Sequence, residues 1–134
     1  MIPGSRSDDC RFRCAYVICR DSGLAFETGK LRVRLPPESG SLESVRMAMV
    51  ESGFGTQAVE LSWDDLYAFV RAKGHYAILH CRGDHFVSAV GFSGRHVRLF
   101  DPATALFSVN ETFLRERYQW NGIAILVTTP EVEI

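Results

Sequence analysis

A cysteine near the N-terminus has the placement of a catalytic thiol. Cys10 opens a stretch with helical periodicity that ends near Gly23, so we expect it in the first turn of a helix. The free backbone N–H groups and the dipole at a helix start stabilise a thiolate and lower the pKa of the thiol. Cys14 and Cys19 lie deeper in the same stretch and lack this placement. Cys10 is therefore the candidate nucleophile.

A thiolate nucleophile works with a base, and the base needs a group that orients it. His85 begins the strand-like segment 85–92, and Asp101 follows the next strand-like segment, 96–100. A turn joins the two segments, which predicts an antiparallel hairpin. His85 and Asp101 are therefore the candidate base and orienting group.

The register of this hairpin decides whether the two side chains can meet. If Phe92 pairs with His96 across a three-residue loop, His85 and Asp101 share a face as diagonal neighbours. If Phe92 pairs with Arg95 across a two-residue loop, they lie on opposite faces. The catalytic interpretation thus requires a longer loop or a β-bulge. The sequence leaves this open.

The rest of the chain predicts an α+β fold, with N-terminal helices packed on an antiparallel sheet. Helices are expected after Asp8 or Asp9, over about 41–52, from the Ser62 cap to about 72, and over 111–118 after Asn110. Strands are expected over 58–61, 75–81, 85–92, 96–100 and 123–128, while 31–35 alternates like a strand and stops at two prolines. Helices first and strands afterwards are typical of the α+β class. No linker divides the chain, so we expect one domain, 1–134.

Composition excludes several classes of protein. Hydrophobic residues make up 46% and charged residues 23%, as in a folded globular domain. Fifteen basic residues against sixteen acidic ones give no basic excess for binding nucleic acid. The apolar runs are too short for a membrane segment, and the N-terminus has no apolar core of a signal peptide, so we expect a cytoplasmic protein.

The remaining cysteines and histidines are interpreted as structural. No C-x-x-C pair is present, and three of the four cysteines share one helical stretch, so we expect reduced thiols and neither a disulfide framework nor a zinc site. We expect core positions for Cys14, Cys19 and Cys81, and surface or strand positions for His75, His80 and His96.

The order of these motifs resembles that of the papain-like cysteine peptidases, and most closely the bacteriocin-processing family, which cleaves leader peptides after a double glycine. The resemblance covers nearly the whole chain. It is carried by the run from Asp9-Cys10-Arg11 to Gly23, by His85-Phe86-Val87-Ser88-Ala89-Val90, by Asp101-Pro102-Ala103, and by Phe113, Trp120 and Gly122.

The resemblance implies a fold, an activity and a site. The fold would be papain-like, and the substrate a leader or other peptide containing small residues, with a transporter as a further partner. Cys10 would attack the peptide carbonyl carbon, His85 would move the proton, and Asp101 would hold the imidazole. The backbone N–H of Cys10 would donate to the oxyanion. No metal or organic cofactor is implied.

Two positions depart from the family pattern. Gly4 stands where the family has a glutamine that donates to the oxyanion hole, and Arg11 stands where it has a glycine. These departures motivate an alternative, in which a degenerate domain of the same fold binds a peptide or a transporter without cleavage. A third hypothesis is acyl transfer, in which an amine instead of water attacks the Cys10 thioester.

Overall fold

The computed structural model describes residues 10–23, 42–82, 85–102 and 106–129. Its helices are α1 (Cys10–Ser22), α3 (Leu42–Glu51), α4 (Trp63–Val70) and α5 (Glu111–Glu116). Its strands are β1 (Gly55–Glu60), β2 (His75–Cys81), β3 (His85–Ser93), β4 (His96–Phe100), β5 (Leu106–Val109) and β6 (Ile123–Thr128). The predicted α+β class is confirmed.

The strands form one six-stranded sheet in the order β1-β6-β2-β3-β4-β5, and every neighbouring pair is antiparallel. Strands β2 to β5 form a meander, as the turns in the sequence indicate. The last strand, β6, then returns to lie between β1 and β2. This return buries β6 in the middle of one half of the sheet, which accounts for its nearly continuous apolar sequence.

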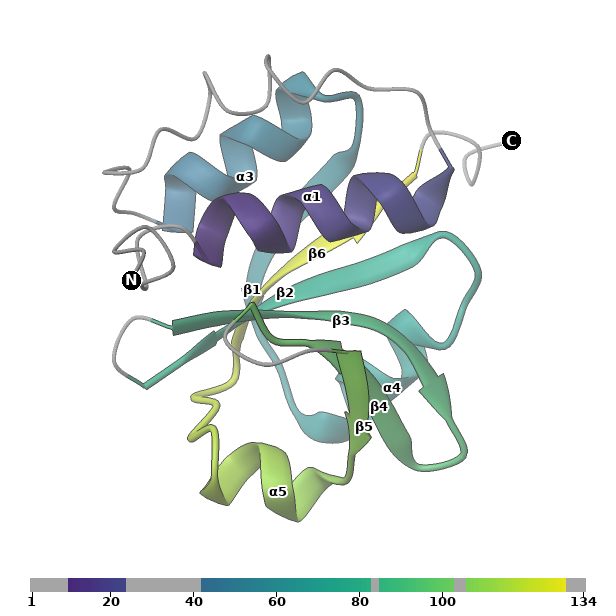
Figure 1. Ribbon diagram of the computed structural model, residues 1–134, viewed down its shortest axis with the longest axis vertical. Helices are drawn as coiled ribbons and strands as arrows, with labels where there is room; N and C mark the ends of the chain where they lie inside the picture. Colours follow the sequence, from purple (N-terminus) through teal and green to yellow (C-terminus); the bar gives the residue numbers. More distant parts are fainter. Residues whose placement is uncertain (1–9, 24–41, 83–84, 103–105, 130–134) are drawn as a thin grey trace, which may run out of the picture.

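Helices cover both faces of the sheet (Figure 1), with α1 and α3 on one face and α4 and α5 on the other. Successive strand residues point to opposite faces, so each strand contributes to two cores. Ile78, Phe86 and Ile125 pack with α1 and α3. Leu79 and Val87 belong to the core beneath α4 and α5.

Local signals set the helix ends. The Ser62 hydroxyl accepts a hydrogen bond from the Asp65 backbone N–H at 3.1 Å, which confirms the predicted cap of α4. The Asn110 side chain caps α5 in the same way. Gly23 has a φ of +78°, the left-handed conformation that ends many helices. The caps expected at Asp8 and Asp9 lie outside the described residues, as does the ambiguous segment 31–35.

Three strands have the predicted bounds, one expected strand has different bounds, and one strand was not predicted. Strands 75–81, 96–100 and 123–128 match β2, β4 and β6. The strand expected over 58–61 begins earlier, at Gly55, because pairing with β6 extends it. Strand β5 was missed, since its four residues at the sheet edge carry no clear alternation and its stability comes from pairing with β4.

Helix α1 runs beside β3 in the same direction. Near its start, the Arg11 guanidinium carbon lies 5.0 Å from the centre of the Phe86 ring. One turn later, the Cys14 carbonyl oxygen accepts a hydrogen bond of 3.0 Å from the buried Ser88 hydroxyl. The first turn of α1 therefore lies at the end of the sheet where β3 begins with His85.

Within the described ranges, none of the helices combines the length and apolar character that crossing a membrane requires.

Candidate active site

A β-bulge brings the candidate base and its orienting group to one face. At the turn, Ser93 pairs with His96, which is the two-residue loop that on its own would separate His85 from Asp101. The register then shifts between Ala89 and Gly91. The extra residue in the bulge places His85 and Asp101 on the same face of the hairpin, as the catalytic interpretation requires. This is one of the two possibilities that the sequence left open.

His85 and Asp101 are hydrogen-bonded. The His85 Nε2 atom lies 2.9 Å from the Asp101 Oδ1 atom, and Asp101 is only 4% exposed. An ionised carboxylate only accepts hydrogen bonds, so Nε2 carries the proton and Nδ1 of a neutral ring is left with its lone pair. In the described part of the chain, Nδ1 makes no hydrogen bond. The imidazole is thus oriented by one nitrogen and available through the other.

Tyr118 completes this cluster, and sequence reasoning missed it. Its hydroxyl donates a hydrogen bond of 2.5 Å to the Asp101 Oδ2 atom. Its ring lies parallel to the His85 imidazole, with an interplanar angle of 7° and 6.3 Å between ring centres. The helix expected over 111–118 ends at Glu116 in the structure, so Tyr118 lies just beyond it. Nothing local marks this tyrosine, because its role depends on a contact with Asp101, 17 residues earlier in the chain.

Cys10 is the first residue of α1, as predicted. Its backbone belongs to the helix, while its side chain lies outside what the structure describes. Gly4, the position of the family's oxyanion glutamine, also lies outside the described residues.

The side chain of Arg11 packs inward. Arg11 is 4% exposed and its guanidinium lies over the Phe86 ring. It therefore does not extend into solvent from the first turn of α1.

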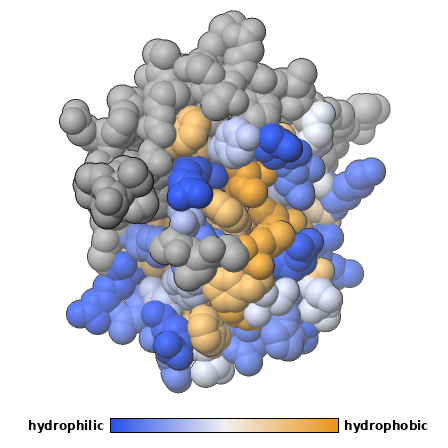
Figure 2. All heavy atoms as spheres, viewed as in Figure 1, coloured by the Kyte–Doolittle hydropathy of each residue, from blue (hydrophilic) through white to orange (hydrophobic). Residues whose placement is uncertain are grey.

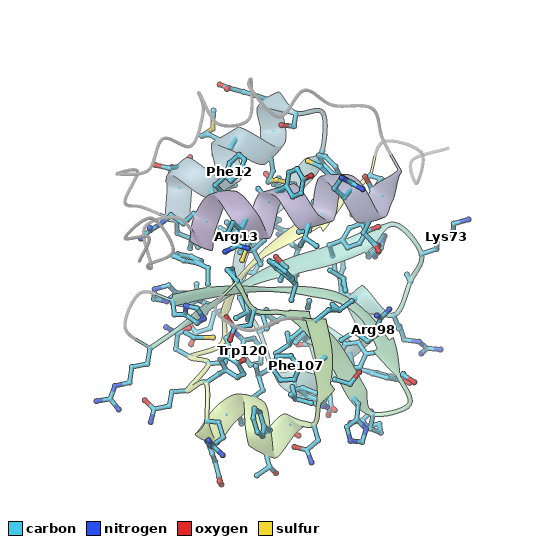
Figure 3. All side chains as sticks on the ribbon, in the orientation of Figure 1. Phe12, Arg13, Lys73, Arg98, Phe107 and Trp120 are labelled. Carbon is cyan, nitrogen blue, oxygen red and sulfur yellow. The ribbon has the colours of Figure 1, made fainter. Side chains whose placement is uncertain are left out.

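A second arginine links α1 to the orienting group. Arg13 projects from α1 (Figure 3), and its Nη1 donates to the Pro102 carbonyl oxygen at 3.3 Å. Pro102 directly follows Asp101, so this contact joins the helix that begins with Cys10 to the segment that carries Asp101.

The later residues of the resemblance support the fold near the site. Figure 3 shows Trp120 and Phe107 between the sheet and α5. The Trp120 Nε1 atom donates to the Ile123 carbonyl oxygen at 3.0 Å. Gly122 has a φ of +89°, and a Cβ there would lie 3.4 Å from the Leu61 carbonyl oxygen, so glycine suits this turn.

The other cysteines and histidines have the structural roles expected of them. The described cysteines are buried, and burial raises the pKa of the Cys19 thiol to about 11. His75 and His80 are half-buried strand residues, and His96 is exposed. Among the described residues, no cluster of histidine, cysteine, aspartate and glutamate could hold a metal ion.

The model of the Peptidase C39 family matches residues 1–132. The chain belongs to the Peptidase C39 family. The predicted peptidase class, a hydrolase of papain-like fold, is confirmed at this level. No curated protein sequence matches the chain.

Solved structures of low sequence identity share the fold. A double-glycine motif protease from an AMS/PCAT transporter, in complex with the leader peptide, has a TM-score of 0.69 at 18% identity, covering 92% of this chain and 87% of that one. The peptidase domain of Streptococcus ComA, a bifunctional ABC transporter involved in quorum sensing, has a TM-score of 0.69 at 16% identity, covering 92% and 93%. The N-terminal peptidase C39-like domain of a Vibrio parahaemolyticus toxin secretion ATP-binding protein has a TM-score of 0.70 at 18% identity, covering 90% and 97%.

Proposed function

We propose that this C39 family member is a cysteine peptidase in which Cys10, His85 and Asp101 act as a triad. The observation that carries the proposal is the 2.9 Å contact between His85 and the buried Asp101, at the end of the sheet where α1 begins. Cys10 is the first residue of that helix. Nucleophile, base and orienting group then occur in the order and on the elements that the family pattern implies.

The thiol of Cys10 and the imidazole of His85 would meet at the start of β3. Phe86 and Ser88 point toward α1, so alternation directs His85 to the opposite face. His85 is the first residue of the strand, however, and its side chain is 25% exposed. The start of α1 lies beside this first residue of β3. Because Nε2 is bonded to Asp101, Nδ1 is the ring atom that would receive the Cys10 proton.

The reaction follows from these roles. His85 takes the Cys10 proton, and the sulfur attacks the carbonyl carbon of the scissile peptide bond. The carbon–nitrogen bond breaks, and the imidazolium returns the proton to the leaving amine. Water then attacks the thioester with His85 again as base, which releases the acid and the free thiol. The backbone N–H of Cys10 would donate to the oxyanion formed in each step.

We propose a peptide with a double glycine as the substrate. Support comes from the family membership and from similarity in fold to a protease solved with its leader peptide. Figure 2 shows hydrophobic side chains gathered between α1 and strands β4 and β5, a surface that suits an apolar peptide segment. Leu106, at 45% exposure, lies on β5. A transporter partner and a cytoplasmic location stay predictions.

Mass spectrometry of the purified protein with synthetic peptides tests this function. We expect one cut, directly after Gly-Gly, and at least about 100-fold slower cleavage of a matched peptide with Leu-Leu at that place, as selection for the double glycine requires. Binding of the Gly-Gly peptide without any cut would contradict the proposal and favour the degenerate binding domain. An amide-linked product formed with an added amine would indicate acyl transfer.

A further inference from the structure

One tyrosine contacts both His85 and Asp101. The Tyr118 hydroxyl donates to Asp101 Oδ2 at 2.5 Å, and the Tyr118 ring is stacked parallel to the His85 imidazole. His85 binds the other carboxylate oxygen, Oδ1. The two oxygens of one buried carboxylate are thus held by two different side chains.

Tyr118 is itself held firmly. Its ring lies 5.9 Å from the Phe113 ring and 6.4 Å from the Phe107 ring, measured between centres. Its carbonyl oxygen accepts a hydrogen bond from the Arg82 backbone N–H. The next residue, Gln119, takes the left-handed conformation at a φ of +54°, so the chain turns directly after Tyr118. Backbone and ring therefore both restrict where the hydroxyl can lie.

A carboxylate held at one oxygen can still rotate, because the terminal torsion of aspartate is broad. The Tyr118 hydroxyl restricts this rotation through a short charge-assisted hydrogen bond to the second oxygen. Asp101 Oδ1 then stays in the direction of the His85 Nε2–H group. The Tyr118 ring also lies parallel to the imidazole, with 6.3 Å between ring centres.

We propose that Tyr118 is a positioning residue that fixes the rotation of Asp101 and, through it, the orientation of the His85 ring. The inference rests on the proposed function, in which Nδ1 of that ring serves Cys10. In this role Tyr118 contacts neither the substrate nor the thiol. It acts by keeping the base aligned.

The variant Tyr118→Phe keeps the ring and removes the hydroxyl. We expect kcat for Gly-Gly peptide cleavage to fall about tenfold, a part of the 10²- to 10⁴-fold that an aligned general base supplies. KM should stay within twofold, because substrate contacts are unchanged. Tyr67→Phe is the matched control, since the Tyr67 ring packs against Phe92 at the turn end of the hairpin, away from His85. It should retain the wild-type kcat and thermal midpoint.

A second comparison separates positioning from a general structural effect. If Tyr118 acts through Asp101, Tyr118→Phe should cause no further loss of kcat in an Asp101→Asn background. An independent tenfold loss in that background would overturn the proposal.

The third measurement needs no turnover, so it separates failure of this inference from failure of the proposed function. A hydrogen-bonded imidazole Nε2–H of His85 should give a downfield proton NMR signal in Cys10→Ala. The signal should move upfield or be lost to exchange when Tyr118→Phe is added, and stay in place when Tyr67→Phe is added. The role of Tyr118 would be overturned by an NMR signal that does not change in Tyr118→Phe, by absence of the signal in Cys10→Ala alone, or by an unchanged kcat. Absence of wild-type cleavage alone would overturn only the proposed function.

Discussion

Replacing Cys10 with alanine is expected to abolish peptide cleavage, with kcat reduced at least about 10⁴-fold. The alanine variant has no nucleophile, so the thioester cannot form and the base has no thiol to activate. The rest of the domain should stay folded, because Cys10 is the first residue of α1 and helix ends contribute little packing. Cleavage rates from liquid chromatography and a thermal unfolding curve measure the two effects separately.

Cys19→Ala is the matched control for this variant, because it removes a thiol from the same helix. Cys19 is 1% exposed and lies in the core between α1 and the sheet. We expect cleavage within about threefold of wild type and a loss of about 1 kcal/mol of unfolding free energy. Wild-type cleavage by Cys10→Ala, with Cys19→Ala inactive, would contradict the assignment of the nucleophile.

Replacing Asp101 with asparagine is expected to lower kcat by about 10² to 10⁴-fold. The amide matches the carboxylate in size but is neutral, so it no longer stabilises the imidazolium that forms when His85 takes the thiol proton. If the amide nitrogen faces His85 Nε2, it favours the tautomer of His85 that carries its proton on Nδ1, which cannot accept the thiol proton there. The 10⁴-fold limit is the loss found for the same substitution in a serine protease triad. The buried position of Asp101 leaves little water to compensate.

Asp64→Asn is the matched control for the aspartate. Asp64 makes a surface ion pair with Arg95, and its side chain is 82% exposed. Such pairs contribute about 0–1 kcal/mol, so activity and stability should both stay near wild type. Cleavage by Asp101→Asn within twofold of wild type, with an unchanged thermal midpoint, would show that Asp101 does not orient the base.

Much of the fold could be predicted because its signals are local. The Ser62 and Asn110 caps and the glycine after α1 are written in neighbouring residues, and the structure places all three as expected. The strands 75–81 and 96–100 are bounded by turn residues in the same way. Local chemistry alone selects these boundaries.

Features that depend on long-range pairing could not be predicted. The insertion of β6 between β1 and β2 joins segments far apart in the chain. Strand β5 is a short edge that forms only against β4. The bulge near Val90 shows the limit most clearly, since one extra residue decides whether His85 and Asp101 share a face. Gly91 inside the strand is compatible with a bulge, but a glycine alone does not fix where the register shifts.

The candidate site divides in the same way. Cys10, His85 and Asp101 could be chosen from residue type, order and resemblance, and the structure joins the last two directly. Tyr118 could not be chosen, because only the folded packing of α5 brings it to Asp101. The inward packing of Arg11 on Phe86 was also invisible in the sequence.

The pH dependence of Cys10 alkylation tests the central claim, that Cys10 and His85 form an assembled pair. The rate of modification by iodoacetamide would be followed by mass spectrometry in wild type and in His85→Ala. Cys10→Ala supplies the background, which should be low because Cys14, Cys19 and Cys81 are buried and the pKa of Cys19 is raised to about 11.

We expect a wild-type midpoint well below the ordinary thiol pKa of about 8.5, because the imidazolium and the helix start both stabilise the thiolate. In His85→Ala the midpoint should move back toward 8.5, and the rate below pH 7 should fall at least about tenfold. A wild-type midpoint near 8.5, or a low midpoint that does not change in His85→Ala, would contradict the pair and with it the proposed triad.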